Sequence, residues 1–172
     1  GHHLYPAFPY DYYTRATDDD LKAIYAWLMI QPPVSQKPTA NELSFPFNQR
    51  LLLAGWKLLF LEQGPLPPDP ATDKDEELKR GRYLVESLSH CGACHSPRNA
   101  LGAAVKTGAN AYSGGLAEGW HVPPLNAASW GPIPWTQKAL VDYLIDGWQG
   151  HHGIASGPMT EVVNDLYDRK ED

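Results

Sequence analysis

Apolar side chains recur at helical spacing in four parts of the chain, and no alternating strand pattern or parallel-sheet pattern is present. The first stripe follows a cluster of aspartates suited to a helix N-terminus and predicts a helix over residues 18–30. The other stripes predict helices over 48–63, from about 72 to 89, and over about 135–145, the last opened by Thr136. The expected fold class is therefore all-α.

Prolines separate these helices. Residues 31–46 are expected to form an extended linker, and residues 64–70 contain four prolines, which predicts a domain boundary near residue 70. The apolar run 51–61 lies between these breakers and would reach only ~17 Å as a helix, against ~30 Å for a hydrocarbon core. We expect this helix to be buried between domains, with a partner surface or the membrane surface as the alternative.

A short tripeptide repeat suggests how the chain is divided. Gly-His-His opens the sequence and occurs again at 150–152. If the two segments are equivalent, residues 1–33 are the C-terminal part of one domain, and 34–70 are a linker with one apolar helix. Residues 71–172 then form a second domain whose final helix is missing. The sequence is on this interpretation a piece of a longer protein.

Composition excludes several classes of protein. The 172 residues include 15 Gly and 16 Pro, with 42% apolar and 20% charged residues, which is typical of a globular, loop-rich chain. The net charge of -6 leaves no broad cationic surface, so no nucleic acid partner is expected.

The only two cysteines lie in the motif Cys91-Gly-Ala-Cys94-His95, which is the attachment pattern of a c-type haem. Two thiols about one turn apart can add to the two vinyl groups of one porphyrin edge, with the next imidazole beneath the iron. A thioredoxin-like dithiol needs a βαβ context and no proximal histidine. A zinc site needs four ligands, and no second cluster with suitable spacing is present. One covalent haem c is predicted.

The sixth iron ligand decides the function, because a second axial ligand closes the iron and leaves electron transfer. Two methionines can supply a thioether. Met29 is in an apolar stretch and is expected to pack in the core. Met159 follows Gly-Pro in a polar, irregular stretch 64 residues after His95, and this loop position makes it the predicted ligand. A thioether raises the reduction potential relative to a second imidazole.

The other histidines and the tryptophans of the predicted haem domain are not expected to ligate the iron. His121, His151 and His152 are each expected to be solvated loop histidines, with a hydrogen bond to a haem propionate as the alternative. Burying a flat apolar porphyrin requires aromatic side chains, and four tryptophans are candidates for this role. They are Trp120, Trp130, Trp135 and Trp148.

Segments 91–99, 118–126, 134–136 and 151–159 resemble the multihaem cytochrome c subunits of periplasm-facing bacterial dehydrogenases. The resemblance extends to 4–10 and 45–47, so nearly the whole chain takes part. Within that group, 134–136 and 151–159 are most similar to the cytochrome partners of molybdenum hydroxylases of the aldehyde, nicotinate or isoquinoline dehydrogenase type. Quinoprotein alcohol and flavin-dependent gluconate dehydrogenases are the alternative partners.

The resemblance implies a class I cytochrome c domain with one haem at 71–172, preceded by the C-terminal part of another cytochrome c domain. It implies a three-haem chain in the periplasm, attached to the inner membrane through the full complex. Electrons would arrive from molybdopterin and iron–sulfur subunits and leave to ubiquinone, a downstream cytochrome or an oxidase. The chain would thus be an electron-transfer subunit and would not itself oxidise the substrate.

By position, the resemblance implies that Cys91 and Cys94 attach haem and that His95 and Met159 ligate iron. The carbonyl of Pro123 would orient the His95 imidazole through its second nitrogen. Trp120 is a further candidate for haem contact, and Arg98 for contact with a propionate or another domain.

Two positions depart from the pattern. Pro124 stands where some relatives have Asn, which removes one polar contact. Phe8 stands where a preceding domain could present an axial methionine, and phenylalanine cannot ligate iron. That domain would need a ligand from outside this sequence, or a haem of unusual ligation, or no haem.

Two other classes of function fit the sequence less well. A dihaem peroxidase-like enzyme would have an open haem ligated by histidine alone, and the single motif and Met159 argue against it. A gas- or redox-sensing module would need an attached signalling domain, which this sequence does not contain.

Overall fold

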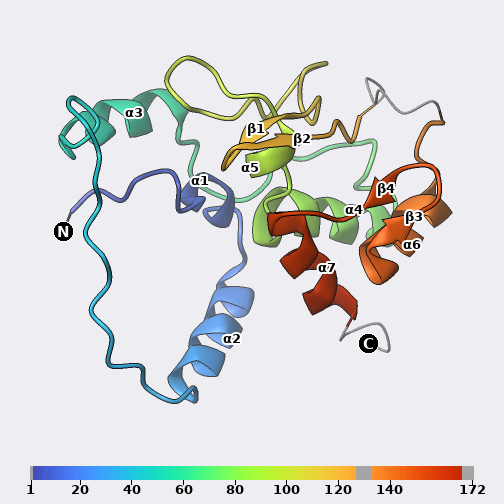
Figure 1. Ribbon diagram of the computed structural model, residues 1–172, viewed down its shortest axis with the longest axis horizontal. Helices are drawn as coiled ribbons and strands as arrows, with labels where there is room; N and C mark the ends of the chain where they lie inside the picture. Colours follow the sequence, from blue (N-terminus) through green and yellow to red (C-terminus); the bar gives the residue numbers. More distant parts are fainter. Residues whose placement is uncertain (1, 127–132, 168–172) are drawn as a thin grey trace. The chain divides into compact units, whose positions relative to one another are not determined.

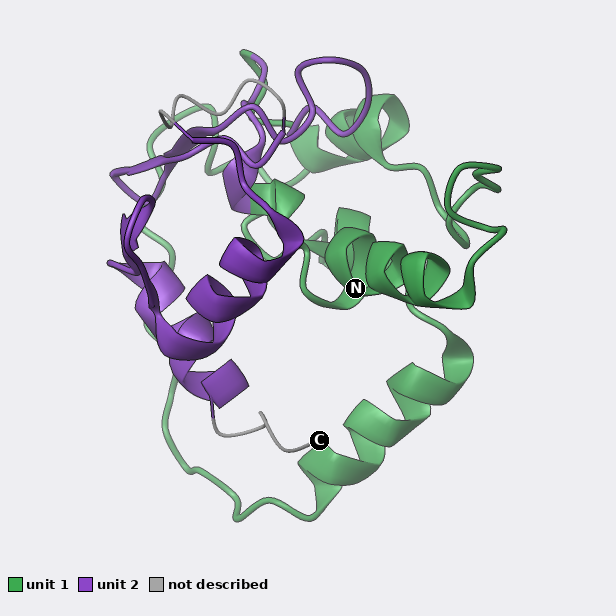
Figure 2. Ribbon diagram, turned by 90° about the vertical axis from the view of Figure 1, so that its right-hand side faces the viewer, with its two compact units in different colours: residues 1–93, 100–103 green, residues 94–99, 104–172 purple. Residues whose placement is uncertain are grey.

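A computed structural model describes residues 2–126 and 133–167 of the chain. The regular secondary structure of these residues is mostly helical, with two small antiparallel sheets of two strands each. The chain divides into two compact units (Figure 2). Unit 1 comprises residues 1–93 and 100–103, and unit 2 comprises residues 94–99 and 104–172.

The elements of unit 1 are helices (Figure 1). They are α1 (Tyr10–Tyr13), α2 (Asp18–Met29), α3 (Leu52–Phe60), α4 (Glu76–Tyr83) and the π-helical turn η1 (Leu84–Leu88). The short helix α5 (Gly92–His95) contains the boundary between the units. Unit 2 continues with β1 (Gly115–Ala117), β2 (Trp120–Val122), α6 (Gln137–Asp146), β3 (Trp148–Gln149), β4 (Gly153–Ile154) and α7 (Pro158–Tyr167).

Side-chain caps explain where two of the predicted helices begin. The Thr17 hydroxyl accepts a hydrogen bond from the Asp20 amide at 3.2 Å and starts α2. Thr136 caps α6 in the same way through the Ala139 amide, at 3.1 Å. The helices predicted over 18–30 and 135–145 are thus confirmed to within two residues at each end.

The helix predicted from about 72 to 89 is shorter and ends in a wider turn. It begins after Asp75, whose carboxylate accepts from the amides of Glu77 and Leu78. The π-helical turn η1 then follows, with the Ser89 amide donating to the Leu84 carbonyl at 2.8 Å. This turn leads directly into the Cys-x-x-Cys-His motif.

Two expectations about burial are wrong for this chain. Met29, expected in the core, is 65% exposed at the end of α2. Helix α3 is shorter than the predicted 48–63, and Leu53 is its only buried residue, whereas Leu58 is 87% exposed. Trp56 attaches α3 to its own unit by donating from Nε1 to the Leu101 carbonyl at 2.9 Å. None of the helices in the described ranges is long and apolar enough to cross a membrane.

The two hairpins and α7 have no counterpart among the predicted elements. In the first hairpin Gly115 pairs with Val122 and Ala117 with Trp120, and β3 pairs with β4 further on. Strands of two or three residues are too short to show an alternating pattern. Helix α7 begins at Pro158, because proline suits the first turn of a helix, where its missing N–H is not needed.

The division into units falls at residues 93 and 94, inside the motif, whereas the sequence predicts a domain boundary near residue 70. The two units group residues that contact one another within this chain, whereas the predicted domains include residues outside this sequence. The three-part division into 1–33, 34–70 and 71–172 therefore stays a prediction.

Arg15 fastens the proline-rich linker within unit 1. Its Nη1 donates to the carbonyls of Gly64 and Pro65, at 3.2 and 2.9 Å, and its Nη2 lies 3.1 Å from Glu62 Oε2. The Gly64 amide in turn donates to the Thr14 hydroxyl at 3.3 Å. The Arg15 side chain is 12% exposed, so these bonds are partly shielded from water.

Tyr83 joins the start of α2 to the end of α4. Its hydroxyl donates to Asp20 Oδ2 and accepts from the Thr17 amide at 3.0 Å. The bond from Tyr83 is the main cause of the lowered pKa of Asp20, with further contributions from Thr17 and the positive charge of Arg80.

Replacing Tyr83 with phenylalanine is expected to lower the free energy of unfolding at neutral pH, by about 1 kcal/mol for the bond to the Thr17 amide alone. The folded-state pKa of Asp20 is lowered, so its contribution is present above the unfolded value of about 3.9 and is lost as the pH falls through the folded value. The difference between wild type and variant should therefore shrink in acid. Denaturant unfolding of both proteins across this range measures it, and a difference independent of pH would exclude Asp20 as a contributor.

Candidate haem-attachment site

Four of the five residues of the Cys-x-x-Cys-His motif form the helical turn α5, and Cys91 directly precedes it. The Cys91 amide donates to the Val85 carbonyl at 3.2 Å and closes the preceding turn, and the Ala93 amide then donates to the His90 carbonyl at 2.7 Å to start α5. Residues three and four apart share one face of a helix. Cys94 and His95 follow Cys91 at these two spacings, which suit a shared face.

The two thiols of the motif are not joined in a disulfide, and the surroundings of Cys94 affect its ionisation. Burial raises the pKa of the Cys94 thiol, although the Arg98 guanidinium opposes this effect and Glu118 adds to it. Among residues 2–126 and 133–167, no group of three or more His, Cys, Asp or Glu side chains could hold a metal ion.

His95 is oriented by a backbone carbonyl. Its Nδ1 lies 2.9 Å from the Pro123 oxygen, and because a carbonyl only accepts, Nδ1 carries the proton and donates. Nε2 therefore keeps its lone pair. Burial lowers the pKa of His95, and the Pro123 carbonyl partly offsets this. The imidazole is thus neutral with Nε2 available as a ligand.

The segment after the motif is held by the loop that follows it. The Gly114 amide donates to the His95 carbonyl at 2.8 Å, and the Val105 amide donates to the Pro97 carbonyl at 2.9 Å. The buried Ser96 hydroxyl accepts from the Tyr112 amide at 3.0 Å. None of these supports is among the predicted site residues, because a lone serine or a loop amide leaves no periodic signal in the sequence.

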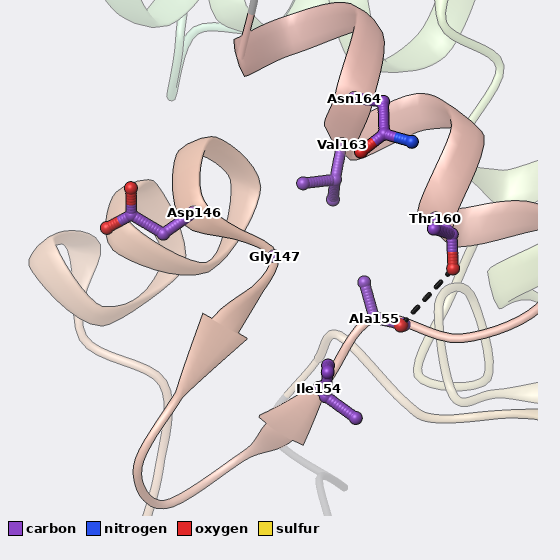
Figure 3. A pocket seen from close by; sticks show the side chains of 7 residues that line it. All are labelled: Asp146, Gly147, Ile154, Ala155, Thr160, Val163 and Asn164. Carbon is purple, nitrogen blue, oxygen red and sulfur yellow. Dashed lines mark hydrogen bonds between the residues drawn. The ribbon is translucent and has the colours of Figure 1, made fainter.

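Met159 lies in a helix, which corrects its expected loop position. It is half-buried and is the second residue of α7. Buried Val163 anchors the next turn of this helix, and the Thr160 hydroxyl donates to the Ala155 carbonyl at 3.2 Å (Figure 3). A cavity of about 190 Å³ lies between the end of α6 and α7. Its lining is Asp146, Gly147, Ile154, Ala155, Thr160, Val163 and Asn164 (Figure 3).

Trp120 and Arg98 occupy different surroundings. Trp120 is 50% exposed on β2, and its indole lies against Gly157, two residues before Met159. Arg98 is exposed and forms an isolated antiparallel bridge with Ala104. The predicted contact of Arg98 with a propionate or another domain stays a prediction.

The aromatic side chains include a stack that the sequence does not predict. His152, expected to be solvated, is half-buried and nearly parallel to Trp135, with ring centroids 3.5 Å apart and planes at 12°. Tyr143 meets the same indole edge-on at 5.4 Å. Trp148 is 61% exposed, and Trp130 lies outside the described residues.

These residues fit a c-type haem. The donors are two thiols at a spacing that suits one helical face, a neutral imidazole with Nε2 available, and a half-buried thioether in the same unit as the imidazole. Exposed apolar side chains of unit 2 include Leu116, Trp120, Val141, Trp148 and Ile154. The site can thus hold haem c, which supplies one-electron chemistry when bound.

No protein-family model matches the chain. The chain is 48% identical to a nicotinate dehydrogenase subunit of Pseudomonas putida over 166 residues, which cover 96% of this chain and 14% of that protein. It is 40% identical to the fructose dehydrogenase cytochrome subunit of Gluconobacter japonicus, covering 95% of this chain and 33% of that protein. It is 36% identical to a diheme cytochrome c-type protein of Cereibacter sphaeroides, and the match covers 94% of this chain and 52% of that protein. The chain thus spans between about a seventh and a half of the length of these relatives.

Proposed function

We propose that this chain belongs to an electron-transfer cytochrome c subunit, because several of its relatives are cytochrome subunits of fructose, gluconate and alcohol dehydrogenases. In this proposal the chain relays electrons through one covalent haem c within residues 71–172. The observation that carries the proposal is the bond from His95 Nδ1 to the Pro123 carbonyl, since it leaves Nε2 as an iron ligand one residue after the second thiol.

Each site residue has a separate task in this proposal. Cys91 and Cys94 would hold the porphyrin edge through thioether bonds, and His95 would hold the iron through Nε2. Met159, in the first turn of α7, would offer its thioether sulfur to the iron. A haem held by both His95 and Met159 would supply outer-sphere electron transfer and would leave no position for oxygen or peroxide.

The proposed electron donor is a molybdopterin and iron–sulfur dehydrogenase that oxidises an aldehyde or an N-heterocycle. The 48% identity to the nicotinate dehydrogenase subunit of Pseudomonas putida supports this choice. The alternative is the cytochrome subunit of a quinoprotein alcohol dehydrogenase or a flavin gluconate dehydrogenase. Alcohol and gluconate dehydrogenase cytochrome subunits are 36 to 37% identical to the chain.

The proposed acceptor is ubiquinone or another respiratory carrier, and the proposed location is the periplasmic face of the inner membrane, reached through the full complex. The resemblance of 91–99 and 151–159 to periplasm-facing subunits supports this location. Further haems are proposed outside the present sequence. The repeat supports a preceding domain at 1–33, because each Gly-His-His is followed at the same spacing by a proline at the start of a helix, Pro9 and Pro158.

The donor assignment predicts which substrate reduces the haem. In the full-length protein purified with its partner subunits, nicotinate or an aldehyde should reduce the haem within the turnover time of the complex. Gluconate, fructose and primary alcohols serve as matched controls and should leave it oxidised. Reduction by gluconate or an alcohol, without reduction by the first two substrates, would favour the alternative partner.

The relay assignment predicts a closed iron. The reduced, native full-length protein should bind carbon monoxide slowly and well below one equivalent per haem of this domain. Fast, stoichiometric binding would instead favour the peroxidase-like enzyme with histidine as its only axial ligand.

A further inference from the structure

One short strand lies between the two segments that carry the iron ligands. Pro123 directly follows β2 and orients His95 through its carbonyl. Trp120 begins the same strand and contacts Gly157, two residues before Met159. At ~3.3 Å per residue, the strand holds these two contacts about 10 Å apart.

The contact between Trp120 and Gly157 is close. A Cβ placed on Gly157 would lie 2.6, 2.8 and 2.9 Å from Cε2, Cδ2 and Cζ2 of the indole. Real Cβ atoms do not approach other atoms so closely, so the indole occupies the space that any larger residue needs. Gly157 also has φ +59°, a conformation that L side chains rarely adopt.

The hairpin that carries Trp120 is hydrogen-bonded to the backbone of His95 through the residue before β1. Strand β2 pairs with β1 through Ala117 opposite Trp120 and Gly115 opposite Val122. The Gly114 amide, one residue before β1, donates to the His95 carbonyl at 2.8 Å. The indole is therefore held in register with the His95 backbone through hydrogen bonds on both strands.

We infer that Trp120 is a positioning residue for the axial methionine, acting through Gly157. Its indole fixes the backbone at Gly157 and so sets where the first turn of α7 presents the Met159 sulfur. This role goes beyond direct haem contact and rests on the proposed ligation by Met159. Because β2 also leads into the contact to His95, a single strand adjusts both axial ligands together.

The chain offers a matched pair of glycines for the test. Gly153 lies in the same segment, between α6 and α7, with φ +89°, and a Cβ there would meet no atom within 4 Å. Alanine at Gly153 therefore adds strained backbone without a clash. Gly157→Ala adds strained backbone and the clash with Trp120, so the difference between the two variants reports on the indole.

The variants are compared as full-length, haem-loaded protein, with haem content per chain measured first. Gly153→Ala should keep the sulfur-to-iron charge-transfer band and the wild-type reduction potential. Gly157→Ala should weaken the band, lower the potential and raise the carbon monoxide binding rate about tenfold, which corresponds to ~1.4 kcal/mol. Trp120→Leu should show a similar but smaller effect.

A double variant isolates the contact. With Trp120→Ala already present, Gly157→Ala should add no more than Gly153→Ala adds, because the clashing indole is gone. Equal effects of Gly157→Ala and Gly153→Ala in the presence of Trp120, or strictly additive effects in the double variant, would overturn the inference. Met159→Leu serves as the reference, since an unchanged band and potential in that variant would refute the ligation by Met159 itself.

Discussion

A full-length chain with alanine at both Cys91 and Cys94 is expected to lose all covalently bound haem from this domain. Thioether bonds need the cysteine sulfurs, and no other cysteine lies in the sequence. After denaturation, the mass of the domain should equal that of the bare polypeptide. The loss should also lower the thermal midpoint, because a group bound only to the folded state stabilises it.

The two single cysteine variants are the matched controls for this experiment. Each keeps one thiol within, or directly before, the turn that presents His95, so each should retain covalent haem at reduced yield. Haem that remains covalently attached in the double variant would contradict the assignment of this motif, whatever the other properties of the protein.

Leucine in place of Met159 is expected to keep the covalent haem and open the iron. Leucine has a similar volume, so the first turn of α7 should stay intact while the sulfur is removed. The reduction potential should fall by a substantial part of the ~0.8 V range that axial ligands span, and carbon monoxide should bind quickly to the reduced protein. Potentiometry and carbon monoxide binding measure the two effects.

The other methionine provides the control. Met29 is 65% exposed at the end of α2 in unit 1, so Met29→Leu removes a thioether and leaves every residue of unit 2 unchanged. This variant should match wild type in both measurements. If Met159→Leu also matched wild type, Met159 would not be the sixth ligand. The proposal of electron relay would then have to rest on another ligand.

Features that depend on a few neighbouring residues could be predicted from the sequence. The helices after Thr17 and Thr136 begin where a hydroxyl accepts from the amide three residues onward, a strictly local bond. The motif at 91–95 is similarly local, because its two thiols and its imidazole follow one another at spacings that suit one helical face.

Features that depend on contacts across the sequence could not be predicted. Trp120 and Gly157 meet although 37 residues separate them, and neither residue belongs to a periodic pattern. The stack of Trp135 on His152 has the same character. For α3, the apolar stripe predicts a helix but does not say which face is covered, and in this chain only Leu53 is buried.

The placement of Met159 shows how a local signal can be read in two ways. Gly157-Pro158 is typical of a loop, yet proline is also suited to the first position of a helix. The glycine ends the irregular stretch and the proline opens α7, so the predicted ligand keeps its place in the sequence but gains a helical backbone.

The hydrogen bonds from Arg15 to residues 62–65 affect how the length of the segment between them can vary. One guanidinium closes a large ring of backbone by holding residues 62–65 beside residue 15. For a closed flexible ring, doubling the number of residues costs only about 0.6 kcal/mol of entropy. Insertions and deletions within the extended stretch 31–46 should therefore leave α1 and α4 undisturbed, which makes this stretch the natural place to add a label or an affinity tag.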